Sequence, residues 1–198
     1  ESFGMWKMGL DEQVMPHIDM ANIACGFHAG DADVMANTLA LAKQHKVMIG
    51  AHPSYPDKQG FGRRSMAMSE KELTNCLHYQ IAAIDGMAAV HGLTLEYVKP
   101  HGALYNDMMS EEQTLNIVMR AVASYAKPLK LMILATNQAA EHKVQAKNLQ
   151  LELILEAFAD RQYTDEGKLV TRSLAGSVHD KPALMAQVRQ LVEHGTVT

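Results

Sequence analysis

Cysteine is scarce in this sequence, which has only two in 198 residues, and neither sign of charge is in large excess. Cys25 and Cys76 form no C-x-x-C pair, so we expect free, buried thiols in a reducing compartment rather than a disulfide framework. The net charge of −4 and the lack of a basic stripe argue against a nucleic-acid partner. No apolar run approaches the roughly 18–20 residues that span a bilayer, so no membrane partner is expected.

Signatures of secretion and of common cofactor sites are also missing. The first residues, ESFGMWKMG, lack the basic and then apolar pattern of a signal peptide, so the expected location is cytoplasmic. Neither GxxxxGK[ST] nor a GxGxxG after a strand occurs, and neither HExxH nor a Cys/His zinc spacing is present. The chain therefore carries no standard nucleotide site, and any metal stays unknown at this stage.

Strand-like and helix-like patterns alternate along the chain. Strands are predicted at 17–25, 46–52, 94–100, 129–134 and 151–159, and helices at 31–45, 69–92, 110–126, 137–148 and 181–195. Asp31 is a predicted N-cap, and the pairs Ser69 with Glu72 and Ser110 with Gln113 are predicted capping boxes. A long loop, 160–179, precedes the last helix.

Five βα units predict a parallel sheet in an α/β protein of one domain, residues 1–198. Five strands do not close a barrel, whereas one further strand at each end would make seven. We therefore predict a barrel whose first and last strands are missing from this sequence, with an open doubly wound sheet as the alternative.

Polar side chains cluster directly after the predicted strands, and in α/β folds those strand ends share one face. The residues concerned are His28 and Asp31; His52, Asp57, Arg63 and Arg64; Lys99, His101, Tyr105 and Asn106; and Asp160, Arg161 and Tyr163. Four separate strand ends each supply His, Lys, Asp or Arg. A catalytic face is therefore favoured over a set of solvated loops.

Two chemistries suit these residues. Histidines with a lysine and an aspartate suit general acid/base catalysis with a cation to hold developing negative charge. Two histidines with an aspartate suit a metal hydrolase. Simpler roles also exist, because His28 could cap a helix, His52 could bond to backbone, and Arg63 with Arg64 could be a solvated pair.

Five segments in order resemble the LamB/YcsF family of lactam-utilisation proteins, understood as the A subunit of bacterial 5-oxoprolinase. These segments are ESFGMW, ANIACGFHAGD, IGAHPSYPDKQGFGRR, VKPHGALYN and FADRQYTDEGKLVTRS. The resemblance implies a distorted (β/α)7 barrel of the glycoside hydrolase/deacetylase type, including a first and a last strand that this sequence does not contain. It implies ATP-dependent opening of the 5-oxoproline lactam to L-glutamate, with subunits B and C as partners and ATP used in the assembled complex.

The resemblance also suggests roles for the residues at the shared face. His101 or His52 is the expected acid or base, Lys99 the oxyanion stabiliser, and Asp160 a group that orients a histidine or binds the ring nitrogen. The expected substrate-binding residues are Asn22, His28, Arg63, Arg64, Asn106 and Arg161.

Two rival hypotheses stay open. One is a metal-dependent amide or acetyl hydrolase with His28, His52 or His101 as ligands. The other is a subunit that binds the substrate without catalysing its conversion.

Overall fold

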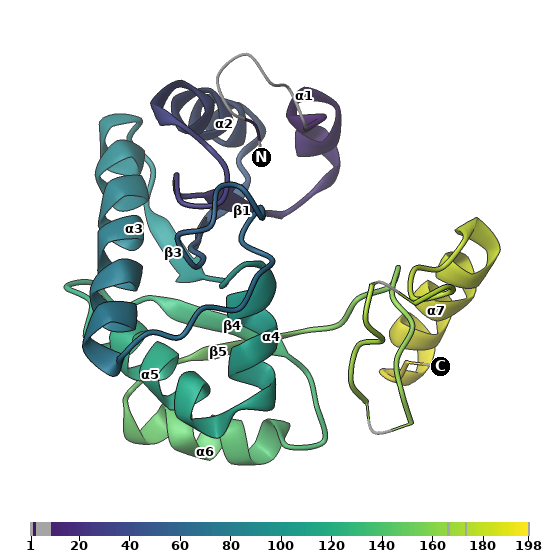
Figure 1. The fold of residues 1–198 in the computed structure, drawn as a ribbon. Coiled ribbons are helices and arrows are strands. Elements are labelled where there is room, and N and C mark those ends of the chain that lie inside the picture. The colour runs from purple at the N-terminus through teal and green to yellow at the C-terminus, as the bar shows by residue number, and fades with distance from the viewer. Residues whose placement is uncertain (1, 3–8, 166, 173, 198) are drawn as a thin grey trace. The chain divides into compact units, whose positions relative to one another are not determined.

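The computed structural model describes residues 2, 9–165, 167–172 and 174–197, and it contains two compact units (Figure 1). The first unit comprises Glu1–Ile133 and Gln145–Ile154, and the second comprises Leu134–Val144 and Leu155–Thr198. The predicted segment ESFGMW lies outside the described residues except for Ser2. Each unit is described by itself, and the prediction of one domain stays a prediction.

Helices and strands alternate as the sequence predicts. In chain order they are α1 (Asp11–Val14), the 3-10 turn η1 (Met15–His17), β1 (Met20–Ala24), α2 (Ala32–His45), β2 (Met48–His52), α3 (Glu70–Val90), β3 (Leu95–Val98), α4 (Gly102–Ser110), α5 (Glu112–Ala123), β4 (Lys130–Leu134), α6 (Ala139–Asn148), β5 (Leu153–Glu156) and α7 (Lys181–His194). None of the described helices combines the length and the apolar character needed to cross a membrane.

The strands form one sheet in the order β1-β2-β3-β4-β5. β1 pairs with β2 in parallel from Met20 opposite Met48 to Ala24 opposite His52, and the pairs β2–β3 and β3–β4 are parallel too. The predicted α/β class with a parallel sheet is confirmed. Among the described strands the sheet does not close on itself, which is compatible with a barrel.

Two local predictions are wrong. Ser110 and Gln113 form no capping box, because Ser110 is the last residue of α4 and α5 follows Glu111, which makes no side-chain cap bond. α4 itself was expected to be a loop, but buried Leu104 and Met108 hold it as a helix. The predicted strand 17–25 begins only at Met20, because η1 occupies its first residue.

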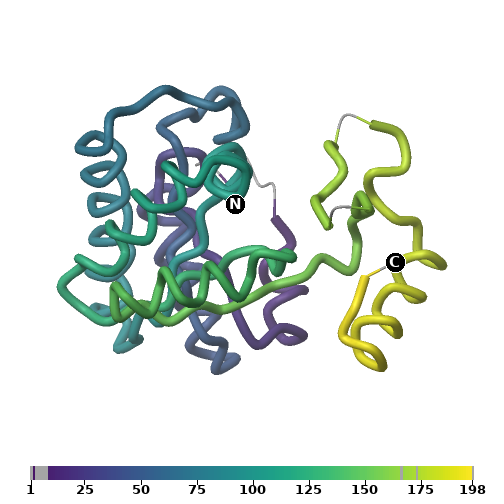
Figure 2. Tube along the Cα trace, turned by 90° about the horizontal axis from the view of Figure 1, so that it is seen from below, coloured from purple at the N-terminus to yellow at the C-terminus, as the bar shows by residue number. Residues whose placement is uncertain are grey.

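α3 is the longest described helix, and its predicted cap and buried face are confirmed. The Ser69 hydroxyl accepts a hydrogen bond from the Glu72 N–H, and the Glu72 carboxylate accepts one from the Ser69 N–H. The predicted apolar face, which consists of Leu73, Leu77, Ile81, Ile84 and Ala88, is buried. α3 contacts β2, β3 and α5 (Figure 2), so it anchors the layer of helices in the first unit to the sheet.

Replacing Ser69 by alanine is expected to lower the free energy of unfolding by about 1 kcal/mol, because the first turn of α3 loses its side-chain acceptor. Urea unfolding followed by circular dichroism measures the change. Ser110→Ala is the matched control, since this exposed serine caps no helix start, and its change should stay within about 0.5 kcal/mol. Equal losses in the two variants would contradict the role of the cap.

Candidate functional site

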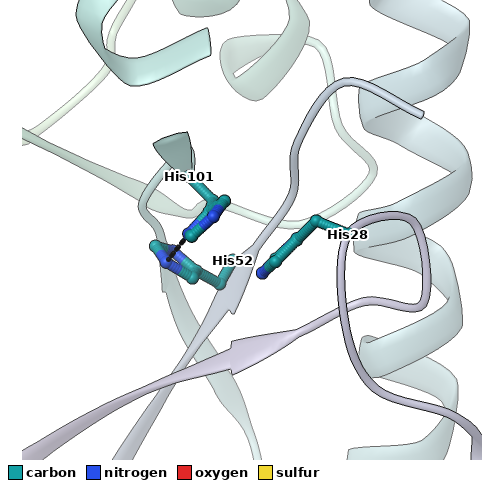
Figure 3. A group of neighbouring side chains, drawn as sticks. All are labelled: His28, His52 and His101. Carbon is teal, nitrogen blue, oxygen red and sulfur yellow. Dashed lines mark hydrogen bonds between the residues drawn. The ribbon is translucent and has the colours of Figure 1, made fainter. Parts of the chain in front are cut away.

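Three histidines from three neighbouring strand ends form a buried cluster in the first unit (Figure 3). His52 is the last residue of β2, His101 is the N-cap of α4 just after β3, and His28 lies in the loop after β1. Because the strands are parallel, their carboxyl ends meet at one edge of the sheet. The exposed fractions of the three residues are only 0–8%.

The rings of this histidine cluster are in direct contact. His101 Nδ1 lies 3.0 Å from His52 Nε2, within hydrogen-bond distance. The His28 and His101 rings stack with centroids 3.8 Å apart and an interplanar angle of 5°. One ring nitrogen of each histidine lies within 4.8 Å of one from each of the other two. The structure thus brings together three of the predicted site residues.

Gln80, which the sequence analysis did not select, holds the loop that follows β2. The side chain of Gln80 is fully buried on α3, accepts a hydrogen bond from the Ser54 N–H at 2.9 Å and donates one to the Ser54 carbonyl at 2.8 Å. The Ser54 hydroxyl in turn lies 3.0 Å from His28 Nδ1. A polar residue beside Leu77 and Ile81 on an apolar helix face was the available signal.

A tight turn at Phe61 and Gly62 lies against the histidine cluster. The Phe61 carbonyl accepts a hydrogen bond from His101 Nε2 at 2.9 Å. Gly62 has a φ of +65°, and a Cβ there would lie 2.9 Å from atoms of both His28 and His101. Glycine is therefore needed for the turn to approach the rings this closely.

Asn22 and Lys99 lie on strands beside the cluster. The Tyr97 hydroxyl donates to Asn22 Oδ1 at 2.9 Å, and Asn22 and His52 both line a cavity of about 260 Å³ beside β1. The Lys99 carbonyl accepts a hydrogen bond from His52 Nδ1 at 2.6 Å, and Lys99 Nζ lies 5.8 Å from the centre of the Tyr105 ring. Asn106 is exposed on α4.

Comparison with known proteins agrees with the predicted resemblance. The model of the LamB/YcsF family matches residues 1–198. The chain belongs to the LamB/YcsF family. Among curated relatives of this family member, one of the 5-oxoprolinase A subunits of Pseudomonas putida is 54% identical over 187 residues, which cover 94% of this chain and 72% of the relative.

A second relative and a solved structure support the same family. The 5-oxoprolinase A subunit of Vibrio cholerae is 51% identical over 199 residues, covering 100% of this chain and 80% of the relative. The crystal structure of the lactam utilization protein from Thermus thermophilus superposes with a TM-score of 0.91 at 37% identity, covering 100% of this LamB/YcsF chain and 79% of the other. The predicted fold class is thereby confirmed.

Two of the predicted substrate-binding arginines of this LamB/YcsF protein differ in their surroundings. Arg64 forms an ion pair with Asp57, whose carboxylate also accepts a hydrogen bond from the Gly60 N–H. The guanidinium of Arg63 lies 5.4 Å from the centre of the Phe61 ring, next to the turn over the cluster. Arg64 is thus held by an acid, whereas Arg63 lies beside the histidine cluster.

The Asp57–Arg64 pair gives a pH-dependent prediction. Hydrogen bonding from Arg64 is the largest cause that lowers the pKa of Asp57 to about 2 in the folded state. The resulting stability is present above the ordinary aspartate pKa of about 3.9 and is lost as the pH falls towards 2. Asp57→Asn should therefore show lower stability at neutral pH and a flatter decline between about pH 4 and 2. Urea unfolding midpoints across that range test this, and an unchanged slope would contradict it.

Asp160 and Arg161 lie in the second unit, so their predicted roles stay predictions. Arg161 is buried, and its guanidinium donates to the Ser177 carbonyl from Nε at 3.1 Å and to the Val170 carbonyl at 2.5 Å. The Asp160 carbonyl accepts a hydrogen bond from the His179 N–H at 2.8 Å. These bonds organise the loop before α7.

Both cysteines are free and buried, as predicted. Desolvation raises the pKa of the Cys25 thiol to about 12. A protonated thiol is a poor nucleophile and a poor metal ligand, so Cys25 is not expected to take part in chemistry at the histidine cluster.

Proposed function

We propose that this chain is the lactam-opening subunit of an ATP-dependent 5-oxoprolinase and works with subunits B and C to convert 5-oxoproline to L-glutamate. The observation that carries the proposal is the buried cluster of His28, His52 and His101 at the strand ends. Its support from relatives is that proteins about 50% identical over the whole chain bear the name of the 5-oxoprolinase A subunit. The free thiols fit a reducing compartment, which makes the cytoplasm the proposed location.

The residues of the site suit the steps of amide hydrolysis. A five-membered lactam is an unstrained amide, so its opening needs an activated water, a proton for the leaving nitrogen and stabilisation of the tetrahedral oxyanion. In this proposal the histidine cluster activates the water, whose oxygen bonds to the carbonyl carbon as the C–N bond breaks. Lys99 offers positive charge for the oxyanion, and the ring nitrogen takes up a proton to become the amine of glutamate.

ATP enters the proposal through the assembled complex. Transfer of its terminal phosphoryl group to the lactam oxygen would activate the carbonyl carbon toward water, and phosphate would then leave with the oxygen. This sequence has no P-loop motif, so the proposal assigns ATP binding to the assembly rather than to a standard motif here.

Among the proposed substrate-binding residues, Arg63 is the best placed for the 5-oxoproline carboxylate, because Arg64 is already paired with Asp57. Asn22 lines the cavity next to His52 and can accept or donate a hydrogen bond to the lactam. Asn106, Asp160 and Arg161 keep their predicted roles within this proposal.

Glutamate release from 5-oxoproline and ATP tests the function. The chain is assayed alone and then with subunits B and C, and we expect activity only in the assembled complex. Complex activity that survives omission of this chain would contradict the proposal. Tight binding of 5-oxoproline by calorimetry without turnover in any assembly would favour a purely binding subunit.

The same histidine cluster favours one second candidate, a metal-dependent amide or acetyl hydrolase that needs no ATP. Three converging imidazoles are a common ligand set of such enzymes. Turnover of an amide or acetylated substrate without ATP and without partner subunits would select it.

A further inference from the structure

We propose that the cluster binds one divalent transition-metal ion through Nε2 of His28, Nε2 of His52 and Nδ1 of His101. The ion would be the water-activating group of the lactam hydrolysis, and this consequence rests on the function proposed above. The binding site itself is argued from the hydrogen bonds around the three rings and does not rest on that function.

The surrounding backbone fixes the protons on two of the rings. His52 Nδ1 lies 2.6 Å from the Lys99 carbonyl oxygen, and His101 Nε2 lies 2.9 Å from the Phe61 carbonyl oxygen. A carbonyl oxygen only accepts hydrogen bonds, so both of these nitrogens carry the hydrogen. In the neutral rings the other nitrogens, His52 Nε2 and His101 Nδ1, therefore hold lone pairs.

Ser54 fixes the third ring in the same way. Its hydroxyl has one hydrogen, which it donates to the Tyr55 carbonyl oxygen at 2.8 Å. The Ser54 oxygen is then the acceptor for His28 Nδ1, 3.0 Å away. Nδ1 carries the hydrogen, so the lone pair of neutral His28 is on Nε2.

These three tautomers direct lone pairs into the cluster. His52 Nε2 and His101 Nδ1 face each other at 3.0 Å, a distance at which two lone pairs repel unless a positive species binds them. A proton can bridge two of the nitrogens, whereas a metal ion can bind all three. Nitrogens bound to one tetrahedral zinc ion at about 2.0–2.1 Å stand about 3.3 Å apart. That spacing lies between the 3.0 Å of this pair and the 4.8 Å limit that holds for all three residues.

The donors select the class of ion. The cluster found among the described residues contains three imidazoles and no carboxylate. Imidazole suits zinc, cobalt, nickel and copper, whereas magnesium and calcium prefer oxygen ligands. Ring N–H groups held by backbone carbonyls or a hydroxyl are the usual outer contacts of metal-binding histidines. Three protein ligands also leave a position for water or substrate, next to the cavity that His52 lines.

Binding requires one ring to turn. An ion lies close to the plane of each imidazole that binds it, but the His28 and His101 rings are parallel, with 5° between their planes. Rotation of His28 out of the stack brings its Nε2 towards the other two nitrogens. The structure thus describes the arrangement before the ion is bound.

The test uses the full chain purified without chelator, then stripped with EDTA and titrated with Co²⁺. We expect one ion per chain by elemental analysis and a visible absorption band typical of four- or five-coordinate cobalt with nitrogen ligands. His28→Gln should abolish stoichiometric binding. Ser54→Ala, which keeps all three ligands, should weaken it by about 10–100-fold. His91→Ala, at the end of α3, should bind as the parent does.

Several outcomes would overturn the site. These are no stoichiometric ion in the parent chain, binding that survives in His28→Gln, or a cobalt spectrum of six oxygen ligands. A shared proton between His52 and His101, seen by nitrogen NMR in a chain that takes up no ion, would also overturn it. Circular dichroism of each variant separates loss of ligands from loss of fold.

Activity separates this inference from the proposed function. Glutamate release by an EDTA-stripped complex, reassayed with only the Mg²⁺ that ATP needs, would refute the catalytic ion and leave the function standing. A stoichiometric ion with no glutamate release in any assembly would leave the site and refute the function.

Discussion

Replacing His52 by alanine is expected to lower glutamate release by the assembled complex by about 10²–10⁴-fold, the range for loss of a group that moves protons or activates water. His52 ends β2, donates from Nδ1 to the Lys99 carbonyl and faces His101 through Nε2. It also lines the cavity beside β1, so it is the member of the cluster that meets bound ligands. Alanine removes each of these contacts at once.

Steady-state kinetics of the reconstituted complex provides the measurement, with kcat and KM determined separately. His91→Ala serves as the control, because the contact recorded for His91 is through its backbone carbonyl, which accepts from Lys43 and which alanine retains. The control should keep the parent turnover. Near-normal turnover in His52→Ala, with the subunits still assembled, would remove the cluster from the mechanism.

Two glycine-to-alanine substitutions are expected to shift stability in opposite directions. At Gly50, in β2, an added Cβ would lie 2.2–2.6 Å from three atoms of the Tyr97 ring, which is fully buried and bonded to Asn22. Overpacking of this kind costs about 1–3 kcal/mol or more. At Gly86, in α3, an added Cβ meets nothing within 4 Å, and alanine favours the helix by about 0.5–1 kcal/mol.

Thermal unfolding followed by circular dichroism distinguishes the two positions. For a chain of this size each kcal/mol shifts Tm by about 2–4 °C, so Gly50→Ala should fall by several degrees while Gly86→Ala rises slightly. A Gly50→Ala protein as stable as the parent would mean that β2 and β3 can separate without cost. A fall in both variants would show that the helix position is more constrained than its surroundings indicate.

Features set by nearby residues were predictable from the sequence. The capping box of Ser69 with Glu72 and the Asp31 cap of α2 depend on neighbours three residues away, and both are confirmed. The histidines after three strands were predicted to share a face, because parallel strands end at one edge of a sheet.

Features set by distant residues were not predictable in the same way. Ser110 with Gln113 has the pattern of a cap, but buried contacts of Leu104 and Met108 extend α4 through Ser110. The roles of Gln80 and the Phe61 carbonyl depend on contacts 26 and 40 residues away along the chain. Periodicity identifies an element, whereas such pairings appear only once the elements are packed.

The bond between Gln80 and the loop after β2 has a consequence for the timescale on which the site can open. The Ser54 N–H is buried and held by a side chain from the middle of α3, so its exchange with solvent deuterium requires α3 to separate from the sheet. The Ser54 amide should therefore exchange as slowly as the core amides of β2, unlike ordinary loop amides. The loop beside the histidine cluster then belongs to the same cooperative unfolding unit as the core, and substrate must enter without it moving aside.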